Sequence, residues 1–215
     1  MPVWPLARLA PCGTAVPYAR QDMLDRRMNS QDPTRPFRLM ARNNRLTNFR
    51  LGQTLRQLAP SEWEAPRSGF FPSLRSTLNH LLTVDLFYVD ALEGGTTGFS
   101  HRETPEPYPD LDDLIAAQAE VDQRLIDFCE GLAPADLDRV VEVHRPDRVQ
   151  REPLPELLLH MSHHATHHRG QVHAMLSATS IAPPPQFDEF LTRDATPARR
   201  DEMRALGWSE DYLAS

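Results

Sequence analysis

The stretch HHATHHRGQ, residues 163–171, holds four of the nine histidines in this chain of 215 residues. Imidazole nitrogens are ligands for zinc, copper, iron and nickel, and they also move protons near neutral pH. A helix brings residues i and i+4 onto one face, about 5–6 Å apart at Cβ. Both His163/His167 and His164/His168 have this spacing, so the position of each pair on its helix must decide which one could bind a metal ion.

The helical wheel of residues 153–179 separates these pairs. At about 100° per residue, the apolar side chains form an arc that contains His168 and has His164 at its edge. The other histidines turn towards solvent, in order of increasing angle from the arc: His160, His167 and His163. We therefore expect His164 and His168 to face the helical core. Of the outer three, His160 is the alternative ligand.

A third ligand is expected from another helix, because two neutral imidazoles alone make a weak site. In residues 71–95, His80 shares a helical stripe with Val84, Phe87 and Ala91, which are expected to face inwards. Three inward histidines from two helices would leave coordination positions open, as catalytic zinc sites do. The alternative is a set of structural histidines whose rings are hydrogen-bonded in the core. The residues alone leave both interpretations open.

Four long amphipathic segments position these histidines: residues 36–58, 71–95, 110–132 and 153–179. The third has acids in its first turn and Gly131 near its end, which suits the helix dipole. Residues 139–152 alternate β-branched and polar side chains around Arg145-Pro146-Asp147, which predicts a short hairpin. The pattern predicts an all-α fold, a four-helix bundle with a small β-hairpin before its last long helix.

The chain is predicted to have three parts: a disordered N-terminal extension (1–30), the bundle (31–192) and a C-terminal tail (193–215). The extension shows no steady period, and a second interpretation places the true start of translation at Met23 or Met28. In the tail, Thr196 followed by Pro197 predicts the start of a short helix that extends to residue 207.

Composition excludes several functional classes. The net charge of −7 argues against a nucleic-acid partner, which would require a basic face. No run of 18 apolar residues is present, so no membrane span is expected. The cysteines, Cys12 and Cys129, lie far apart without a CxxC pattern, which favours the reducing cytoplasm and excludes a disulfide scaffold.

Other polar residues could complete a site. Arg169 falls beside the histidine stripe and could pair with Asp85; the alternative is a surface arginine. Gln171 falls on the ligand side, where it could hydrogen-bond a ligand histidine or a bound water. Cys129 is expected to be a small core residue rather than a nucleophile. Chemistry would therefore depend on the metal ion, and the candidates for a general base are His160, His163 and Asp85.

The segments FPSLRSTLNHLL and LLLHMSHHATHHRGQVHAML resemble the DinB/YfiT-like superfamily, which is unrelated to the DNA polymerase that shares the DinB name. The resemblance extends over residues 36–192. It implies a four-helix bundle of up-down-down-up order and a divalent metal held by His80, His164 and His168. The sequence departs from the family in having His163 where asparagine is common, and in its N-terminal extension.

The resemblance also implies a function. Similar proteins with assigned activities are hydrolases, or transfer or isomerise with small thiols such as mycothiol or bacillithiol. It therefore implies an enzyme that uses zinc or nickel and acts on a small molecule. The enzyme would be either a metal-dependent hydrolase or a thiol-dependent transferase or isomerase. The resemblance also implies a cytoplasmic homodimer. A low-molecular-weight thiol would be the co-substrate. The alternative is a non-catalytic, stress-related interaction bundle in which the ion is a structural staple.

Overall fold

The computed structural model describes residues 32–187, 197–209 and 211–214. The chain separates into two compact units, Met1–Asp32 and Pro33–Ser215, and every described helix and strand belongs to the second. The extension predicted at residues 1–30 lies outside the described residues.

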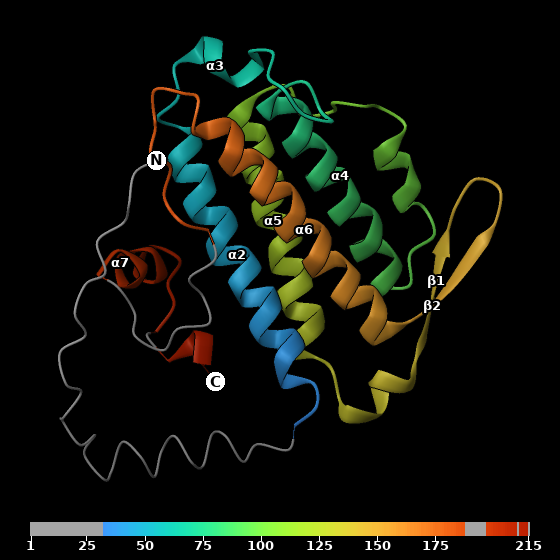
Figure 1. Ribbon diagram of the computed structural model, residues 1–215. Helices are drawn as coiled ribbons and strands as arrows, with labels where there is room; N and C mark the ends of the chain where they lie inside the picture. The colour runs from blue at the N-terminus through green and yellow to red at the C-terminus, as the bar shows by residue number, and fades with distance from the viewer. Residues whose placement is uncertain (1–31, 188–196, 210, 215) are drawn as a thin grey trace, which may run out of the picture. The chain divides into compact units, whose positions relative to one another are not determined.

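The described part of the chain is mainly helical and carries one small antiparallel hairpin (Figure 1). Its α-helices are α2 (Arg35–Leu55), α3 (Pro60–Glu64), α4 (Leu74–Leu92), α5 (Leu111–Glu130), α6 (Leu154–Leu176) and α7 (Pro197–Ala205). Its strands are β1 (Val140–His144) and β2 (Val149–Pro153), and its 3-10 helices are η1 (Gly98–Arg102), η2 (Pro134–Asp138) and η4 (Tyr212–Ala214). No helix among these residues is long and apolar enough to cross a membrane.

The four long segments predicted to be helical are confirmed as α2, α4, α5 and α6, and local signals set their ends. The Ser73 hydroxyl accepts a hydrogen bond from the backbone N–H of Ser76, so α4 begins later than predicted. The Asp110 carboxylate caps α5 in the same way. After α4, Gly94 adopts a φ of 84°, in the left-handed region that glycine tolerates and other residues avoid.

The predicted hairpin is also confirmed, and its alternation matches its burial. Val141 and Val143 of β1 are buried and β1 packs against α4, whereas Val140 is exposed on the other face. β2 ends at Pro153, and α6 begins at the next residue. The hairpin therefore fixes the start of the helix that carries most of the histidines.

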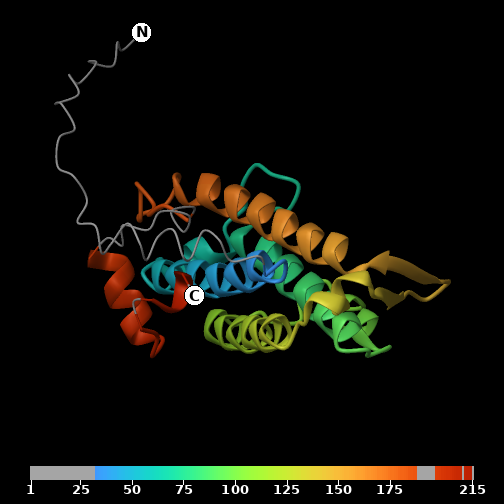
Figure 2. The same cartoon turned by 90° about the horizontal axis from the view of Figure 1, so that it is seen from below.

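The long helices share one hydrophobic core. α2 packs along α5, and α4 packs against both α5 and α6. Seen from below, α6 and α5 lie on opposite sides of α2 and α4 (Figure 2). The largest fully buried side chains come mainly from these helices and include Leu55, Leu74, Leu81, Leu82, Phe87, Leu92, Val121, Ile126, Leu154 and Leu176. The burial of so many large aliphatic groups is the main stabilising contribution to this arrangement.

The short helix α3 and the 3-10 helices η1, η2 and η4 were not predicted. α3 and the 3-10 helices are too short to show a helical period, and contacts with other segments position them. In α3, the buried Trp63 indole N–H donates to the carbonyl oxygen of Pro109 at 3.0 Å, which ties α3 to the proline-rich loop before α5. Such a contact between distant segments leaves no local pattern in the sequence.

The C-terminal helix α7 lies within residues 196–207, where the sequence predicts a short helix, and it packs against α2. The Arg50 guanidinium donates to both carboxylate oxygens of Glu202, at 2.8 and 2.6 Å. The Met203 side chain is fully buried. The Arg50–Glu202 ion pair and the buried Met203 side chain thus hold α7 against α2.

Candidate metal centre

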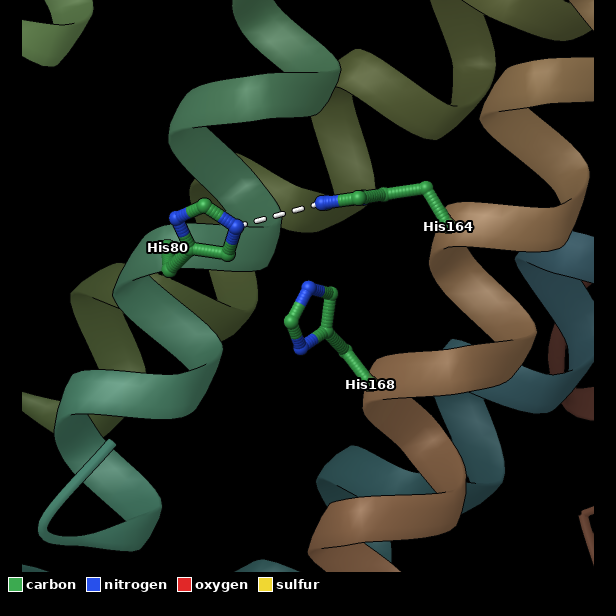
Figure 3. A group of neighbouring side chains, drawn as sticks. All are labelled: His80, His164 and His168. Atoms are coloured by element: carbon green, nitrogen blue, oxygen red, sulfur yellow. Dashed lines mark hydrogen bonds between the residues drawn. The ribbon is translucent and has the colours of Figure 1, made fainter. Parts of the chain in front are cut away.

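His80 on α4 and the pair His164 and His168 on α6 converge between the two helices (Figure 3). Each offers one ring nitrogen, and the three nitrogens lie within 4.8 Å of one another. The ring centroids are 4.4 Å apart for His164 and His168, and 4.7 Å apart for His80 and His168. The packing of α4 against α6 brings together the three residues that the helical wheel places inwards.

The hydrogen-bonding of this cluster is incomplete for a purely structural role. The Nε2 atoms of His80 and His164 are 3.1 Å apart, so a hydrogen bond between them needs a proton on one of the two. The Nδ1 atom of His164 is buried and has no hydrogen-bond partner among the described residues. A structural histidine in a core normally has both ring nitrogens satisfied. Facing Nε2 atoms beside an orphaned nitrogen fit a site for a divalent transition ion.

Burial lowers the pKa of all three rings. The pKa of His80 falls to about 4 and that of His164 to about 3, because burial disfavours the imidazolium and His168 adds nearby positive charge. Burial also lowers the pKa of His168, against the effect of its hydrogen bond to Gln171. The rings are therefore neutral at pH 7, which is the form in which imidazole binds a metal.

Gln171 orients one ring of the cluster. Its Oε1 lies 2.8 Å from Nδ1 of His168, and its Nε2 lies 3.1 Å from Nε2 of His167. An amide oxygen accepts from an N–H, so His168 Nδ1 carries the proton and its Nε2 keeps a free lone pair. The position of Gln171 on the helical wheel suggested a hydrogen bond to a ligand histidine, and the structure has this bond, to His168.

Replacing Gln171 with leucine should weaken zinc binding by about 10- to 100-fold, the usual effect of losing a group that orients a ligand histidine. The ring of His168 would then be free to rotate or change tautomer. Isothermal titration of the metal-free protein with zinc measures this affinity. His167→Ala is the control, because it removes the exposed partner of Gln171 and leaves His168 oriented. Equal affinities for Gln171→Leu and the wild type would contradict the role of Gln171.

The other histidines of the fourth long helix lie outside the cluster. His160, His163 and His167 are exposed. The centroid of the His160 ring lies 5.4 Å from that of the buried Tyr88 and 6.2 Å from that of His164. His160 is thus a neighbour of the candidate ligands and not one of them.

Asp85, which the sequence also offered as a candidate base, lies in a buried polar network and not at the histidine cluster. The Gln118 side-chain amide donates to Asp85 at 2.9 Å and to Asp122 at 3.0 Å. Burial, and then the nearby Asp122, raise the pKa of Asp85 to about 7. Burial also raises the pKa of Asp122, whereas its hydrogen bonds from Asn48 and Gln118 lower it. Both carboxyls are buried and accept hydrogen bonds from side-chain amides.

The ion pair predicted between Arg169 and Asp85 is not made, and Arg169 is buried and not on the surface. Its guanidinium donates to Oδ1 of Asn44 at 2.5 Å and to Oδ1 of Asn48 at 3.2 Å. These two residues, one turn apart on α2, donate in turn to Asp122 at 2.9 and 3.0 Å. Asn44 and Asn48 therefore connect Arg169 to Asp122 instead. The positive charge of Arg169 still lowers the pKa of Asp85.

The raised pKa of Asp85 predicts a pH-dependent stability. Between the unfolded value of 3.8 and the folded value of about 7, the folded chain keeps a proton that the unfolded chain has lost. The free energy of unfolding should therefore fall as pH rises through this window, by up to about 1.4 kcal/mol per pH unit from this group. Asp85→Asn stays neutral and can still accept from Gln118, so it should lose this contribution.

Urea denaturation of both metal-free proteins from about pH 4 to about pH 7, the window between the two pKa values, measures the difference. We expect Asp85→Asn to gain stability relative to the wild type as pH rises towards neutrality. Parallel pH profiles for the two proteins would show that Asp85 titrates normally.

Some residues of the site gave no sequence signal. The ring of Phe71 lies 4.5 Å from that of His80 and 5.7 Å from that of His168, so it forms an apolar wall of the cluster. Phe71 precedes α4 in an irregular segment, where no period indicates its direction. The inward amides Asn44 and Asn48 did carry a signal, since they share the spacing of one helical turn with each other.

Comparison with known proteins gives the family. The model of the DinB family matches residues 28–203, which is most of the chain. Protein DinB of Bacillus subtilis (strain 168) is 23% identical over 147 residues, which cover 64% of this chain and 83% of that protein. The residues matched by the family model include α4 and α6, and with them His80, His164 and His168. The chain belongs to the DinB family.

Proposed function

We propose that this chain is a metal-dependent enzyme that binds one zinc or nickel ion through His80, His164 and His168 and acts on a small molecule. The convergence of three neutral ring nitrogens within 4.8 Å carries this proposal. His80 and His164 are only half-buried, which supports access from one side. A divalent ion bound by three imidazoles supplies Lewis acidity and keeps coordination positions open.

His160 is the best-supported group for proton transfer. It lies one turn before His164 on α6, is exposed, and has its ring 6.2 Å from that of His164. An exposed imidazole accepts and donates protons near neutral pH. Asp85 is less well supported as a base, because its carboxyl is buried and hydrogen-bonded to Gln118.

The proposed reaction is hydrolysis, or transfer or isomerisation with a low-molecular-weight thiol. Family membership supports both classes, and thiolates are ligands that soft transition ions accept. The rival function, a structural staple, would need a closed coordination sphere. Among the described residues the cluster has three histidines, and His160 stays outside it, which favours the enzyme.

We further propose that the four long helices form a bundle of up-down-down-up order. The pairing of Arg42, near the start of α2, with Glu130, at the end of α5, supports opposite directions for these helices. Asn79, near the start of α4, donates to the carbonyl oxygen of Tyr108 just before α5, which supports parallel α4 and α5. We also propose a homodimer, on the ground of the resemblance, and a cytoplasmic location, on the grounds of the resemblance and the cysteine usage. Light scattering of the purified chain tests the dimer.

The experiment compares the wild type, His80→Ala and His160→Ala after reconstitution with zinc or nickel. Rates are measured for hydrolysis of an activated ester and for transfer of cysteine, mycothiol or bacillithiol to an electrophile. We expect His80→Ala to lose metal and activity together. His160→Ala should keep the metal and lose about a hundredfold or more in rate, as removal of a general base does. Rates for the wild type no higher than for His80→Ala in both assays would contradict an enzyme of either class.

A further inference from the structure

Two arginines near the histidine cluster lack a carboxylate partner in the described part of the chain. Arg102 ends η1 and Arg145 lies in the hairpin turn, and both elements adjoin α4. Their guanidinium carbons lie 5.7 and 5.3 Å from the ring centroid of the same residue, Phe87. Two cations are thus gathered over one aromatic ring at the end of α4.

The partners of Arg145 are neutral. Its guanidinium donates to Oε1 of Gln150 at 2.7 Å and reaches the Tyr88 hydroxyl at 3.5 Å. Elsewhere in this acidic chain, exposed arginines pair with acids: Arg124 with Glu93 at 2.6 Å is one example. Two half-buried guanidinium groups without an acid leave positive charge that an incoming anion could neutralise.

A continuous set of contacts connects these arginines to the histidine cluster. Tyr88, which Arg145 contacts, has its ring 5.4 Å from that of His160, and His160 adjoins His164 at 6.2 Å. Arg102 lies over the same ring as Arg145, that of Phe87, which is about two helical turns from His80 on α4. The arginines therefore stand beside the same face of α4 and α6 that carries the candidate metal ligands.

We infer that Arg102 and Arg145 bind an oxyanion, a carboxylate or phosphate group, on the substrate of the histidine cluster. The inference rests on the proposed function, because it names the substrate class for that site. Guanidinium groups bind carboxylate and phosphate through paired N–H donors, and the Tyr88 hydroxyl adds a neutral donor. The substrate would be a small anion, held by its charged group at the arginines with its reacting group at the histidines.

Isothermal titration at low ionic strength tests the inference with succinate, inorganic phosphate and the neutral succinamide as probes. The proteins are the wild type, Arg102→Gln, Arg145→Gln and the control Arg151→Gln, whose exposed side chain pairs with Glu142 on the hairpin. We expect an anion to bind and succinamide not to bind. Each site variant should weaken binding by about tenfold or more, the effect of losing a charge-assisted hydrogen bond, and Arg151→Gln should leave it unchanged. Preference for succinate or for phosphate identifies the anionic group.

Further variants distinguish the loss of positive charge from a structural effect of the substitution. They also distinguish failure of this inference from failure of the proposed function. Arg102→Lys keeps the charge and should restore part of the affinity, whereas a merely structural role would change only thermal stability. The His80→Ala variant should still bind the probe anion. If the wild type holds no metal but Arg102→Gln still weakens anion binding, the proposed function fails and the anion site stands. Equal affinity of the wild type and Arg102→Gln for both anions, or equal binding of succinate and succinamide, overturns the inference.

Discussion

Replacing His164 with alanine should lower the affinity of the chain for zinc by at least about a hundredfold, because losing a ligand should cost no less than losing a group that orients one. His164 contacts both other histidines of the cluster, with its ring 4.4 Å from that of His168 and its Nε2 3.1 Å from that of His80. Its Nδ1 has no other partner among the described residues, so the ring contributes little else to the fold. Isothermal titration of the metal-free proteins measures the affinity.

The matched control is His163→Ala. His163 is the neighbouring residue on α6, has the same side chain and is exposed outside the cluster. Its removal should leave zinc affinity unchanged, and circular dichroism should show that both variants are folded. Zinc binding by His164→Ala as tight as that of the wild type, or an equal loss in both variants, would contradict the assignment of His164 as a ligand.

Replacing Asp122 with alanine should destabilise the fold by about 3 kcal/mol, the range found when one member of a buried charged network is removed. The Asp122 carboxylate accepts hydrogen bonds from Asn44, Asn48 and Gln118, and its charge is the larger of two that offset the buried charge of Arg169. Without it, the buried amide donors lose their acceptor and the buried guanidinium loses an opposite charge, and each of these losses adds a desolvation cost.

Glu142→Ala is the comparison for Asp122→Ala. It removes a carboxylate that pairs with Arg151 at 2.9 Å on the exposed hairpin surface. Such a pair contributes at most about 1 kcal/mol. Urea denaturation of both variants at pH 7 measures the two changes. A loss of stability for Asp122→Ala no larger than that for Glu142→Ala would show that the network is not needed to hold the four long helices together.

The sequence was informative wherever a regular period or a local signal set the structure. The cap residues Ser73 and Asp110 sit where α4 and α5 begin. The alternation of β-branched and polar residues predicted the hairpin, in which Val141 and Val143 are buried. The helical wheel placed His164 and His168 inwards without knowledge of the neighbouring helix. A helix fixes the direction of each side chain to within a fraction of a turn, which is sufficient to select a face.

Direction alone did not identify the partner of a side chain. Arg169 was expected to meet Asp85, but its guanidinium donates to Asn44 and Asn48 of α2 instead. Which helices are neighbours, and how deeply each residue is buried, depends on packing over long sequence distances. The network around Asp122 was missed for the same reason, since polar residues at inward positions look like interruptions of an apolar stripe.

Residues from irregular segments were the hardest to predict. Phe71 comes from the segment before α4, and Arg102 and Arg145 from a 3-10 turn and a hairpin turn. None of these positions has a period that shows where the side chain points. They reach the histidine cluster only because α4 packs between α6 and the shorter elements, and no local pattern encodes that packing.

Elemental analysis of the untagged chain, purified without added metal, shows whether His80, His164 and His168 hold one transition-metal ion when His80→Ala is measured alongside. We expect about one zinc or nickel ion per chain in the wild type, as for a three-histidine site, and almost none in the variant. No metal in the folded wild type, or the same metal content in the folded variant, would contradict the assignment of these three ligands.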